Sequence, residues 1–335
     1  MAKVSTAEPI RLEEDLFTFP IPLPNNPLKW LNCYVLRGGP GERNLLVDTG
    51  FYRPECIAAL EEGLRQLSLK PEDTDVFLSH LHSDHAGNAR YLQDRGCRIL
   101  MGARDYAIIS LPSHNRWARS GQHVLREGMP LRQLERMRQE NREVSVTSSD
   151  FEAVQLQDGD VLLVAGRELL CVLTPGHTPG HMCLYDRQGE TMFLGDHVLF
   201  DISPNITFWM DVADPLGDYL DSLRAMLRFP VRLALPGHRT LPQIPIEERI
   251  VQLLHHHQWR LENMLQVLAE EPGLTAYELA GRMRWRIHAK SWETFPPGQQ
   301  YFALGETLSH LDHLLLQGKL RRTEEPECPP RYSLL

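Results

Sequence analysis

This sequence of 335 residues has no segment that could span a membrane. No apolar run approaches the roughly 20 residues that a helix needs to cross a bilayer. The first residues, MAKVSTAEPIRLEEDLF, lack both a basic start and an apolar stretch, so we expect no secretory signal. Both absences argue against a membrane protein and favour a cytoplasmic one.

Closely spaced cysteine pairs are also missing. The six cysteines are scattered and form no CxxC motif: Cys33, Cys56, Cys97, Cys171, Cys183 and Cys328. Several lie in apolar, strand-like runs, where buried reduced thiols are the ordinary outcome. This pattern agrees with a cytoplasmic location and predicts no disulfide framework.

Positive charge is scarce, with 35 Lys and Arg against 44 Asp and Glu and a net charge of −9. Broad nucleic-acid binding needs cationic side chains that neutralise phosphates, so the composition argues against it. Apolar residues make up 42% of the chain and charged residues 24%, as in ordinary globular proteins. The length suffices for a full hydrophobic core and a second, smaller domain.

The first 245 residues alternate between short apolar runs and helical patterns, which indicates sheets covered by helices. We expect strands at 32–36, 44–47, 75–78, 96–100, 153–156, 161–164, 168–173, 181–185, 191–194 and 232–235. A helix is predicted at 54–67. Residues 105–148 break this rhythm and read as a helical insertion, either a lid over a site or a solvated decoration.

Residues 246–335 differ in composition and form a predicted second unit. Ile246 to Glu270 reads as one long amphipathic helix, which Pro272-Gly273 ends. A short helix capped by Thr275 and Glu278, a helix at 302–317 and a two-stranded ribbon should follow. This order resembles a winged-helix module.

The charge of this tail bears on its role. Residues 273–335 carry eight Lys and Arg and seven Asp and Glu, a net of +1 that leaves −10 on the rest. A DNA-reading module is usually more basic. We therefore expect the tail to pack against the first domain or to pair with another subunit in a homodimer.

The stretch FLSHLHSDHAGN (77–88) carries the main chemical signal, because it places His80, His82, Asp84 and His85 within six residues. Imidazole and carboxylate groups suit a borderline divalent cation such as zinc. His80 and His82 lie two residues apart in extended backbone, so both can point to one side and bind one ion. Asp84 and His85 follow the bend and can face a second ion.

HLHSDH resembles the HxHxDH signature of the metallo-β-lactamase superfamily. Four further segments resemble motifs of that family in the same order: VDTG with Asp48, TPGHTPGH with His177, LGDHV with Asp196 and ALPGHR with His238. The resemblance covers roughly residues 30–240. It implies a four-layer αββα sandwich for residues 1–245, and the order of elements in the tail adds a linker helix and a winged-helix-like domain at 246–335.

The resemblance also implies a ligand assignment. His80, His82 and His177 would bind one metal, Asp84, His85 and His238 the other, and Asp196 would bridge them. Asp48 would support the ligand loop. The donors are all nitrogen and oxygen, so zinc is the default, while iron or manganese stays open because bridging carboxylates suit harder ions.

This site predicts a dinuclear metal-dependent hydrolase acting on a small-molecule substrate. Hydroxide held by two ions about 3.5–4 Å apart would attack an ester, thioester or lactone carbonyl, with Asp84 orienting it. One alternative is phosphodiester cleavage of single-stranded RNA, favoured by the tail and disfavoured by the acidic charge. Another is a non-catalytic DNA-binding regulator, which the complete ligand set disfavours.

The remaining histidines receive other interpretations. His181 and His197 neighbour ligand positions and are expected to hydrogen-bond or pack behind them. The run His255–His257 lies within a helix, which indicates a solvated or domain-interface role, although His256 and Arg260 could reach the rim of the site. His114 and His123 fall in the insertion, while His288, His310 and His313 are expected to be ordinary surface or packing residues.

Overall fold

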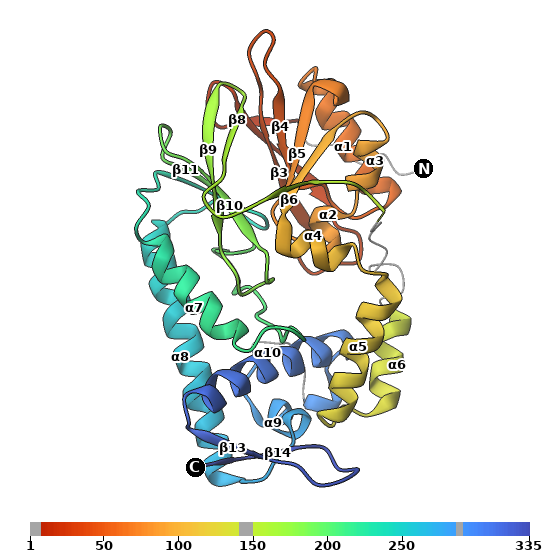
Figure 1. The fold of residues 1–335 in the computed structure, drawn as a ribbon, viewed down its shortest axis with the longest axis vertical. Coiled ribbons are helices and arrows are strands. Elements are labelled where there is room, and N and C mark those ends of the chain that lie inside the picture. Colours follow the sequence, from red (N-terminus) through yellow and green to blue (C-terminus); the bar gives the residue numbers. More distant parts are fainter. Residues whose placement is uncertain (1–7, 141–149, 286–290) are drawn as a thin grey trace.

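Two β-sheets face each other in the upper half of the molecule (Figure 1). The protein is described here by a computed structural model that covers residues 8–140, 150–285 and 291–335, with backbone alone at 113–117 and 140. The seven-stranded sheet runs in sequence order: β1 (Ile10–Arg11), β2 (Leu16–Pro22), β3 (Trp30–Leu36), β4 (Asn44–Val47), β5 (Thr74–Leu78), β6 (Arg98–Gly102) and β7 (Val154–Leu156). The five-stranded sheet has the order β12-β11-β10-β9-β8: β8 (Val161–Val164), β9 (Arg167–Leu173), β10 (Met182–Asp186), β11 (Thr191–Gly195) and β12 (Leu233–Pro236).

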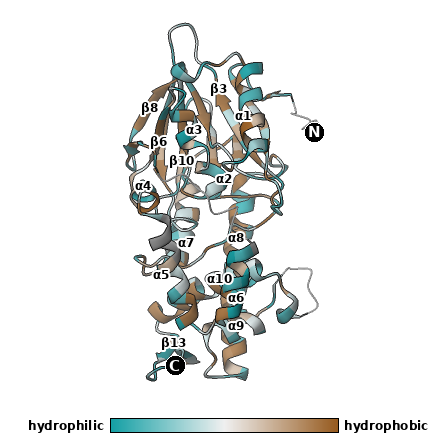
Figure 2. Ribbon diagram, turned by 90° about the vertical axis from the view of Figure 1, so that its right-hand side faces the viewer, coloured by the Kyte–Doolittle hydropathy of each residue, from teal (hydrophilic) through white to brown (hydrophobic). Residues whose placement is uncertain are grey.

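Alternation along the strands divides the sandwich into layers. In β3, Tyr34 and Leu36 enter the apolar cluster between the two sheets, whereas Cys33 and Val35 enter the cluster under the helices of the first sheet. Successive side chains of a strand point to opposite faces, so a strand buried on both faces is apolar throughout. Figure 2 shows this hydrophobic character in the strands of the sandwich.

Helices cover the outer face of each sheet. The first sheet carries α1 (Pro54–Gln66), the 3₁₀ turn η1 (Pro71–Asp73), α2 (Ser83–Ala86), α3 (Ala89–Gln93) and α4 (Ala103–Ile109). The second packs against α7 (Pro215–Met226) and α8 (Ile246–Glu270) through residues that include Tyr185 and Met192. The predicted αββα arrangement is therefore confirmed.

Most predicted elements are present within one or two residues. Strands β1 and β2 and helix α7 were not predicted. Strand β2 contains Pro20 and Pro22, and proline cannot donate a ladder hydrogen bond. It is tolerated because β1 pairs only with Phe17 and Thr18, so the prolines lie beyond the end of that neighbour.

The C-terminal region has the predicted order of elements: α9 (Ala276–Arg282), the 3₁₀ turn η2 (Trp292–Thr294), α10 (Pro297–Leu316), β13 (Leu320–Thr323) and β14 (Arg331–Leu334). The capping box at Thr275 and Glu278 is confirmed, with both reciprocal bonds formed. Helix α10 begins five residues before the predicted start, at a proline, which suits the first helical position because its missing N–H has no helical partner. None of the described helices combines the length and the hydropathy needed to cross a bilayer.

The insertion packs with this C-terminal region. Its helices α5 (Ser113–Arg126) and α6 (Leu131–Glu140) lie beside α10 in the lower half of Figure 1. Val124 and Leu134 are buried in the same apolar cluster as Leu304 and Leu308 of α10. The interpretation as a solvated decoration is therefore wrong for the described part of the insertion. The boundary at 245/246 stays a prediction, because this core draws on residues from both sides of it.

Candidate metal centre

All the candidate ligands lie where strands end, at one edge of the two sheets. His80 and His82 follow β5, with Asp84 and His85 in the short helix α2. The other three also follow strands: His177 after β9, Asp196 after β11 and His238 after β12. This common placement brings together residues that are up to 158 positions apart in the sequence.

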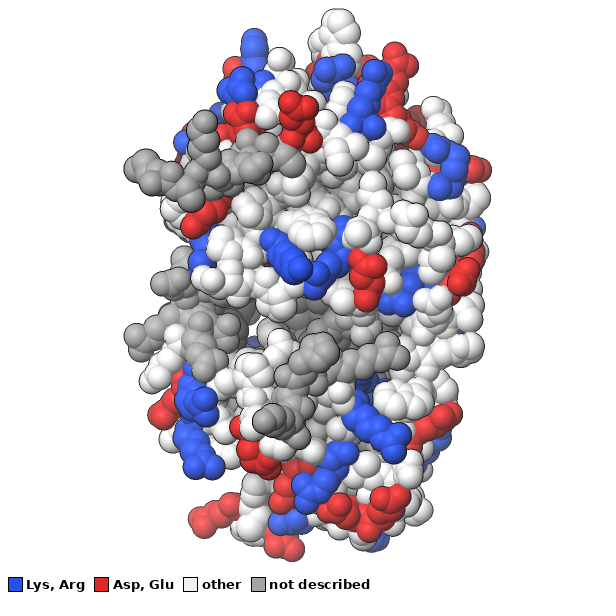
Figure 3. All heavy atoms as spheres, turned by 180° about the vertical axis from the view of Figure 1, so that it is seen from behind, with Lys and Arg blue, Asp and Glu red and all other residues white. Residues whose placement is uncertain are grey.

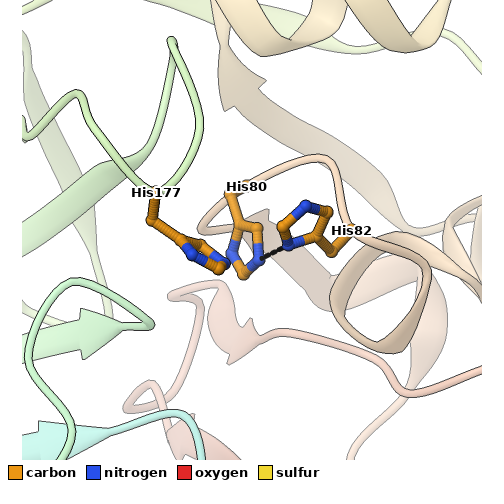
Figure 4. Close-up of side chains that lie close together, drawn as sticks. All are labelled: His80, His82 and His177. Atoms are coloured by element: carbon orange, nitrogen blue, oxygen red, sulfur yellow. Dashed lines mark hydrogen bonds between the residues drawn. The ribbon is translucent and has the colours of Figure 1, made fainter. Parts of the chain in front are cut away.

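His80, His82 and His177 form a three-histidine set, and their rings converge in Figure 4. One ring nitrogen of each lies within 4.8 Å of the others, and His80 Nε2 is 3.0 Å from His82 Nδ1. Nitrogens bound to one tetrahedral zinc at about 2.0–2.1 Å lie roughly 3.3 Å apart, so this spacing fits a shared cation.

The hydrogen bonds around this set leave lone pairs facing inward. His177 Nδ1 donates to the carbonyl oxygen of Asn205 at 2.8 Å, and its Nε2 is buried with no partner among the described residues. The Ser79 hydroxyl donates to Asp48 at 2.8 Å, so its oxygen is free to accept from His80 Nδ1 at 3.0 Å. Both contacts fit the tautomer in which Nε2 can bind a metal.

Asp84, His85 and His238 form a second, mixed set. His238 Nε2 lies 3.3 Å from Asp84 Oδ2 and 3.1 Å from His85 Nε2. The other nitrogens are engaged: His85 Nδ1 with Asp48 at 2.8 Å and His238 Nδ1 with the Trp30 carbonyl at 3.0 Å. Two inward nitrogens at this distance require a proton or a cation between them.

Asp196 lies between the two sets. Its Oδ2 is 3.6 Å from His177 Nε2, and its Oδ1 is 3.5 Å from the Nε2 atoms of both His85 and His238. Oδ1 is buried without a hydrogen-bond partner in the described part of the chain. One carboxylate oxygen thus faces each set, as a bridging ligand requires.

The pKa values agree with a cation site. Burial is the main cause that lowers the pKa of His82 to about 3 and of His177 to about 4, so both rings are neutral and able to bind metal. Burial acts on His85 in the same direction, but the carboxylates of Asp48, Asp196 and Asp84 outweigh it and raise its pKa to about 10. The negative charges of these three carboxylates around His85 therefore need a compensating positive charge, which a metal ion would supply.

Two buried carboxylates, Asp48 and Asp105, support the ligand loops. The resemblance implied this role for Asp48, whereas the sequence did not predict it for Asp105. Asp48 accepts from the backbone N–H and the hydroxyl of Ser79, each at 2.8 Å, besides its contact with His85. Asp105 was assigned only to the start of the insertion. No local signal marks it, because its partners lie 24 to 75 positions away in the sequence.

Asp105 joins the two loops that carry the three-histidine set. Its fully buried carboxylate accepts from the Leu81 N–H at 2.9 Å, the Thr178 hydroxyl at 2.7 Å and the Gly180 N–H at 2.6 Å. Leu81 lies between His80 and His82, and Thr178 follows His177. The relative position of the loops therefore depends on this side chain.

The other histidines do not belong to the two sets. His181 Nε2 accepts from the Asp196 N–H at 3.1 Å, so it supports the bridging residue as expected. His257 is fully buried between His310 of α10, at 3.1 Å, and the ring of Tyr219 of α7, with centroids 5.4 Å apart. It therefore packs where the two predicted units meet. Arg260 is buried beside Glu306 of α10, and its position at the rim of the site stays a prediction.

A further group, His256, His257 and Glu306, also has metal-ligand spacing. Arg260 Nε lies 3.3 Å from Glu306 Oε1. The guanidinium already brings a positive charge to this carboxylate, and its repulsion opposes a second cation. We do not assign a metal to this group.

Comparison with known proteins decides the family. The metallo-beta-lactamase superfamily profile matches residues 31–238, and that of a metallo-beta-lactamase-like C-terminal domain matches 293–335. The chain belongs to the metallo-beta-lactamase superfamily. The first match spans every candidate ligand, from His80 to His238, so the family assignment and the site geometry concern the same residues.

Two relatives of this superfamily member extend over most of its length. A metallo-beta-lactamase family protein of Thermus thermophilus is 31% identical, with a TM-score of 0.80 over 97% of this chain and 100% of that one. A probable metallo-hydrolase of Bacillus subtilis is 27% identical over 82% of this chain and 85% of its own.

Fungal relatives are longer. A lactamase-like protein of Neosartorya fischeri is 24% identical over 73% of this chain, and the match spans only 58% of the fungal protein. Members of the superfamily include metal-dependent hydrolases, and this chain has the His and Asp clusters that can bind metal ions.

Proposed function

We propose that the protein hydrolyses an ester or thioester bond of a small-molecule substrate, a lactone being a cyclic case, with two divalent cations. Zinc is the first choice, and iron or manganese also suits the donors. The observation that carries the proposal is the position of Asp196, which turns one oxygen toward each ligand set. A carboxylate so placed favours two ions over one.

Each side chain has a role in this proposal. The three-histidine set would hold one ion, the mixed set the other, and Asp196 would bridge them. When bound, the pair of ions supplies Lewis acidity and lowers the pKa of water toward neutrality. Asp84 would accept a hydrogen bond from the attacking water and orient it toward the carbonyl carbon.

The exposure of the candidate ligands indicates the side from which a substrate can reach the site. His80, His85 and His238 are fully buried, whereas His82 and Asp84 are partly exposed. The ring of Trp209 stacks on His82 with their centroids 6.4 Å apart. A substrate would enter on the side of Asp84, with an aromatic wall beside it.

The charge of the surface favours a carbonyl substrate over RNA. Acidic residues outnumber basic ones by nine, and both signs intermingle on the face in Figure 3. Proteins that bind single-stranded nucleic acid use a continuous cationic groove with stacking platforms. Cleavage of RNA is therefore the alternative outcome of the test.

The test is a hydrolysis panel on metal-loaded protein: acyl thioesters, simple esters, lactones, phosphodiester reporters and single-stranded RNA. Turnover of a carbonyl substrate is expected. Asp84→Ala should lower it at least about 100-fold. Asp94→Ala, at the exposed C-terminal end of α3, should leave it unchanged.

Three results would count against the proposal. Activity confined to RNA or phosphodiesters would replace it with a nuclease. No hydrolysis combined with tight DNA binding would favour a regulator. Unchanged turnover of Asp84→Ala with two bound ions would refute the role of Asp84.

A further inference from the structure

The segment between β11 and α7 runs from the metal centre to the C-terminal helices. Its Asn205 carbonyl accepts the hydrogen bond from His177 Nδ1 at 2.8 Å. Its Trp209 ring stacks on His82 at an interplanar angle of 24°. Two of the three members of the three-histidine set are therefore contacted by this one segment.

Helix α10 holds the same segment through one of its faces. The Asn205 side-chain amide lies 3.3 Å from Glu306 Oε2 and 3.4 Å from the Phe302 carbonyl oxygen. The Ser309 hydroxyl donates to the Ile206 carbonyl at 2.6 Å. Positions 302, 306 and 309 are three and four residues apart, so they lie on one side of the helix.

Gly305 belongs to this face and allows the close approach. A Cβ atom at this position would lie 2.3 Å from Thr207 Oγ1 and 3.3 Å from Thr207 Cβ. No pair of carbon and oxygen atoms tolerates 2.3 Å without displacement. An added Cβ would therefore displace the Thr207 hydroxyl, and the tight contact with Thr207 Cβ would shift that atom by a few tenths of an ångström away from α10.

The carboxylate of Glu306 is itself held in place. Arg260 of α8 lies 3.3 Å from Glu306 Oε1, and both side chains are buried. The guanidinium stacks on Trp285 at 4.3 Å from the ring centroid. A buried ion pair is weak evidence for stability, but it fixes the direction of the groups that it joins.

The mixed set is supported from the N-terminal part of the chain. Asp48 and the Trp30 carbonyl orient His85 and His238, and both belong to the first 50 residues of the chain. No hydrogen bond in the described part of the chain joins α10 to these two histidines. The two sets share Asp48, which also reaches His80 through Ser79, but the contact that passes from α10 through Asn205 ends on the three-histidine set alone.

We propose that α10 is a positioning element for the three-histidine set, acting through Asn205 on His177. Gly305, Glu306 and Ser309 are positioning residues, because they touch the 205–208 segment and not the reacting atoms. The C-terminal region then sets the metal affinity of one ligand set and leaves the other unchanged. This inference rests on the proposed dinuclear site.

The experiment measures Co²⁺ and Zn²⁺ affinity of the full chain by competition with a chelator. The substitution His238→Ala leaves only the three-histidine set complete, and His82→Ala leaves only the mixed set. Gly305→Ala is added to each. We expect affinity to fall about 10-fold or more in the first background, the scale seen when an outer support of a metal ligand is lost, and less than about 2-fold in the second.

Rescue separates positioning from general damage. Thr207→Ala removes the oxygen that a Cβ at position 305 would meet, so the double variant should regain most of the affinity. Ser309→Ala should also lower the metal affinity of the three-histidine set, and it does so by removing a hydrogen bond without introducing a steric clash. Leu316→Ala, at an exposed position of α10, is the matched control and should change neither set.

Equal weakening of both sets, or no change in either, would overturn the inference. The inference would also be overturned if Thr207→Ala failed to restore the metal affinity and Ser309→Ala left it unchanged. These results differ from failure of the proposed function. A different substrate class with two bound ions would overturn the proposed function alone, whereas fewer than two ions in the unmodified protein would overturn both proposals.

Discussion

Replacing Asp105 by alanine tests whether one buried carboxylate ties the ligand loops together. In the native protein it accepts three hydrogen bonds from Leu81, Thr178 and Gly180. The alanine variant leaves these three donors in a site without solvent, since the carboxylate is fully buried. The Thr178 hydroxyl can rotate to another acceptor, but the two backbone N–H groups cannot.

The magnitude follows from those two groups. A buried donor that loses its partner costs about 1–3 kcal/mol, and removal of a buried charge offsets part of the sum. We expect the free energy of unfolding to fall by about 3 kcal/mol at pH 8.

The loss should also depend on pH. Burial raises the pKa of Asp105 from 3.8 to about 6. A raised folded-state pKa adds stability at low pH that is lost as pH rises through 6. Alanine does not titrate, so the difference between native protein and variant should be larger at pH 5 than at pH 8, by about 1.4 kcal/mol.

The assay is urea unfolding followed by circular dichroism at both pH values, in chelator so that metal binding does not contribute. Asp94→Ala, an exposed carboxylate, is the control and should change stability by less than about 0.5 kcal/mol. A loss below about 1 kcal/mol for Asp105→Ala would refute the joining role. A smaller loss at pH 5 than at pH 8 would refute the raised pKa.

Three further outcomes are expected. Asp196→Asn should lower the bound metal from two ions per chain to one or fewer, because an amide offers one acceptor oxygen where two are needed. Elemental analysis measures this number, and two retained ions would contradict the bridging role of Asp196. Burial is the main cause that raises the pKa of Asp312 to about 7, so its ionised form is disfavoured in the folded state. The native protein therefore loses stability relative to Asp312→Asn as pH rises from 5 to 8, by about 2–3 kcal/mol in urea unfolding, and a constant difference would argue against this. Thr275→Ala should lower thermal stability by about 1 kcal/mol through loss of the capping box, and an unchanged midpoint would show that the cap contributes little.

The sequence by itself determined the sandwich and the candidate ligands. Strand and helix periodicity is local, so short apolar runs such as Asn44–Val47 and the long helix Ile246–Glu270 could be read directly. The ligand motifs are also local, since four candidate donors lie within six residues of the chain. Each motif follows a strand, which predicted one shared edge.

Only the tertiary structure decided what supports those ligands. Asp105 and Asn205 contact the ligand loops or ligands across 24 to 75 positions of the chain, and neither belongs to a motif. The insertion carries an amphipathic pattern, which shows that it has a buried face but not which partner buries it. Hydrophobic pattern specifies burial, whereas the partner depends on the packing of the whole chain.

The same reason explains the role of α10. Its apolar stripe was visible in the sequence, and Gly305 and Glu306 gave no sign of a connection with His177. That connection passes through Asn205, about 100 positions earlier in the chain, and exists only once two remote segments pack together. Pairwise contacts of this kind follow from three-dimensional proximity, which local periodicity does not encode.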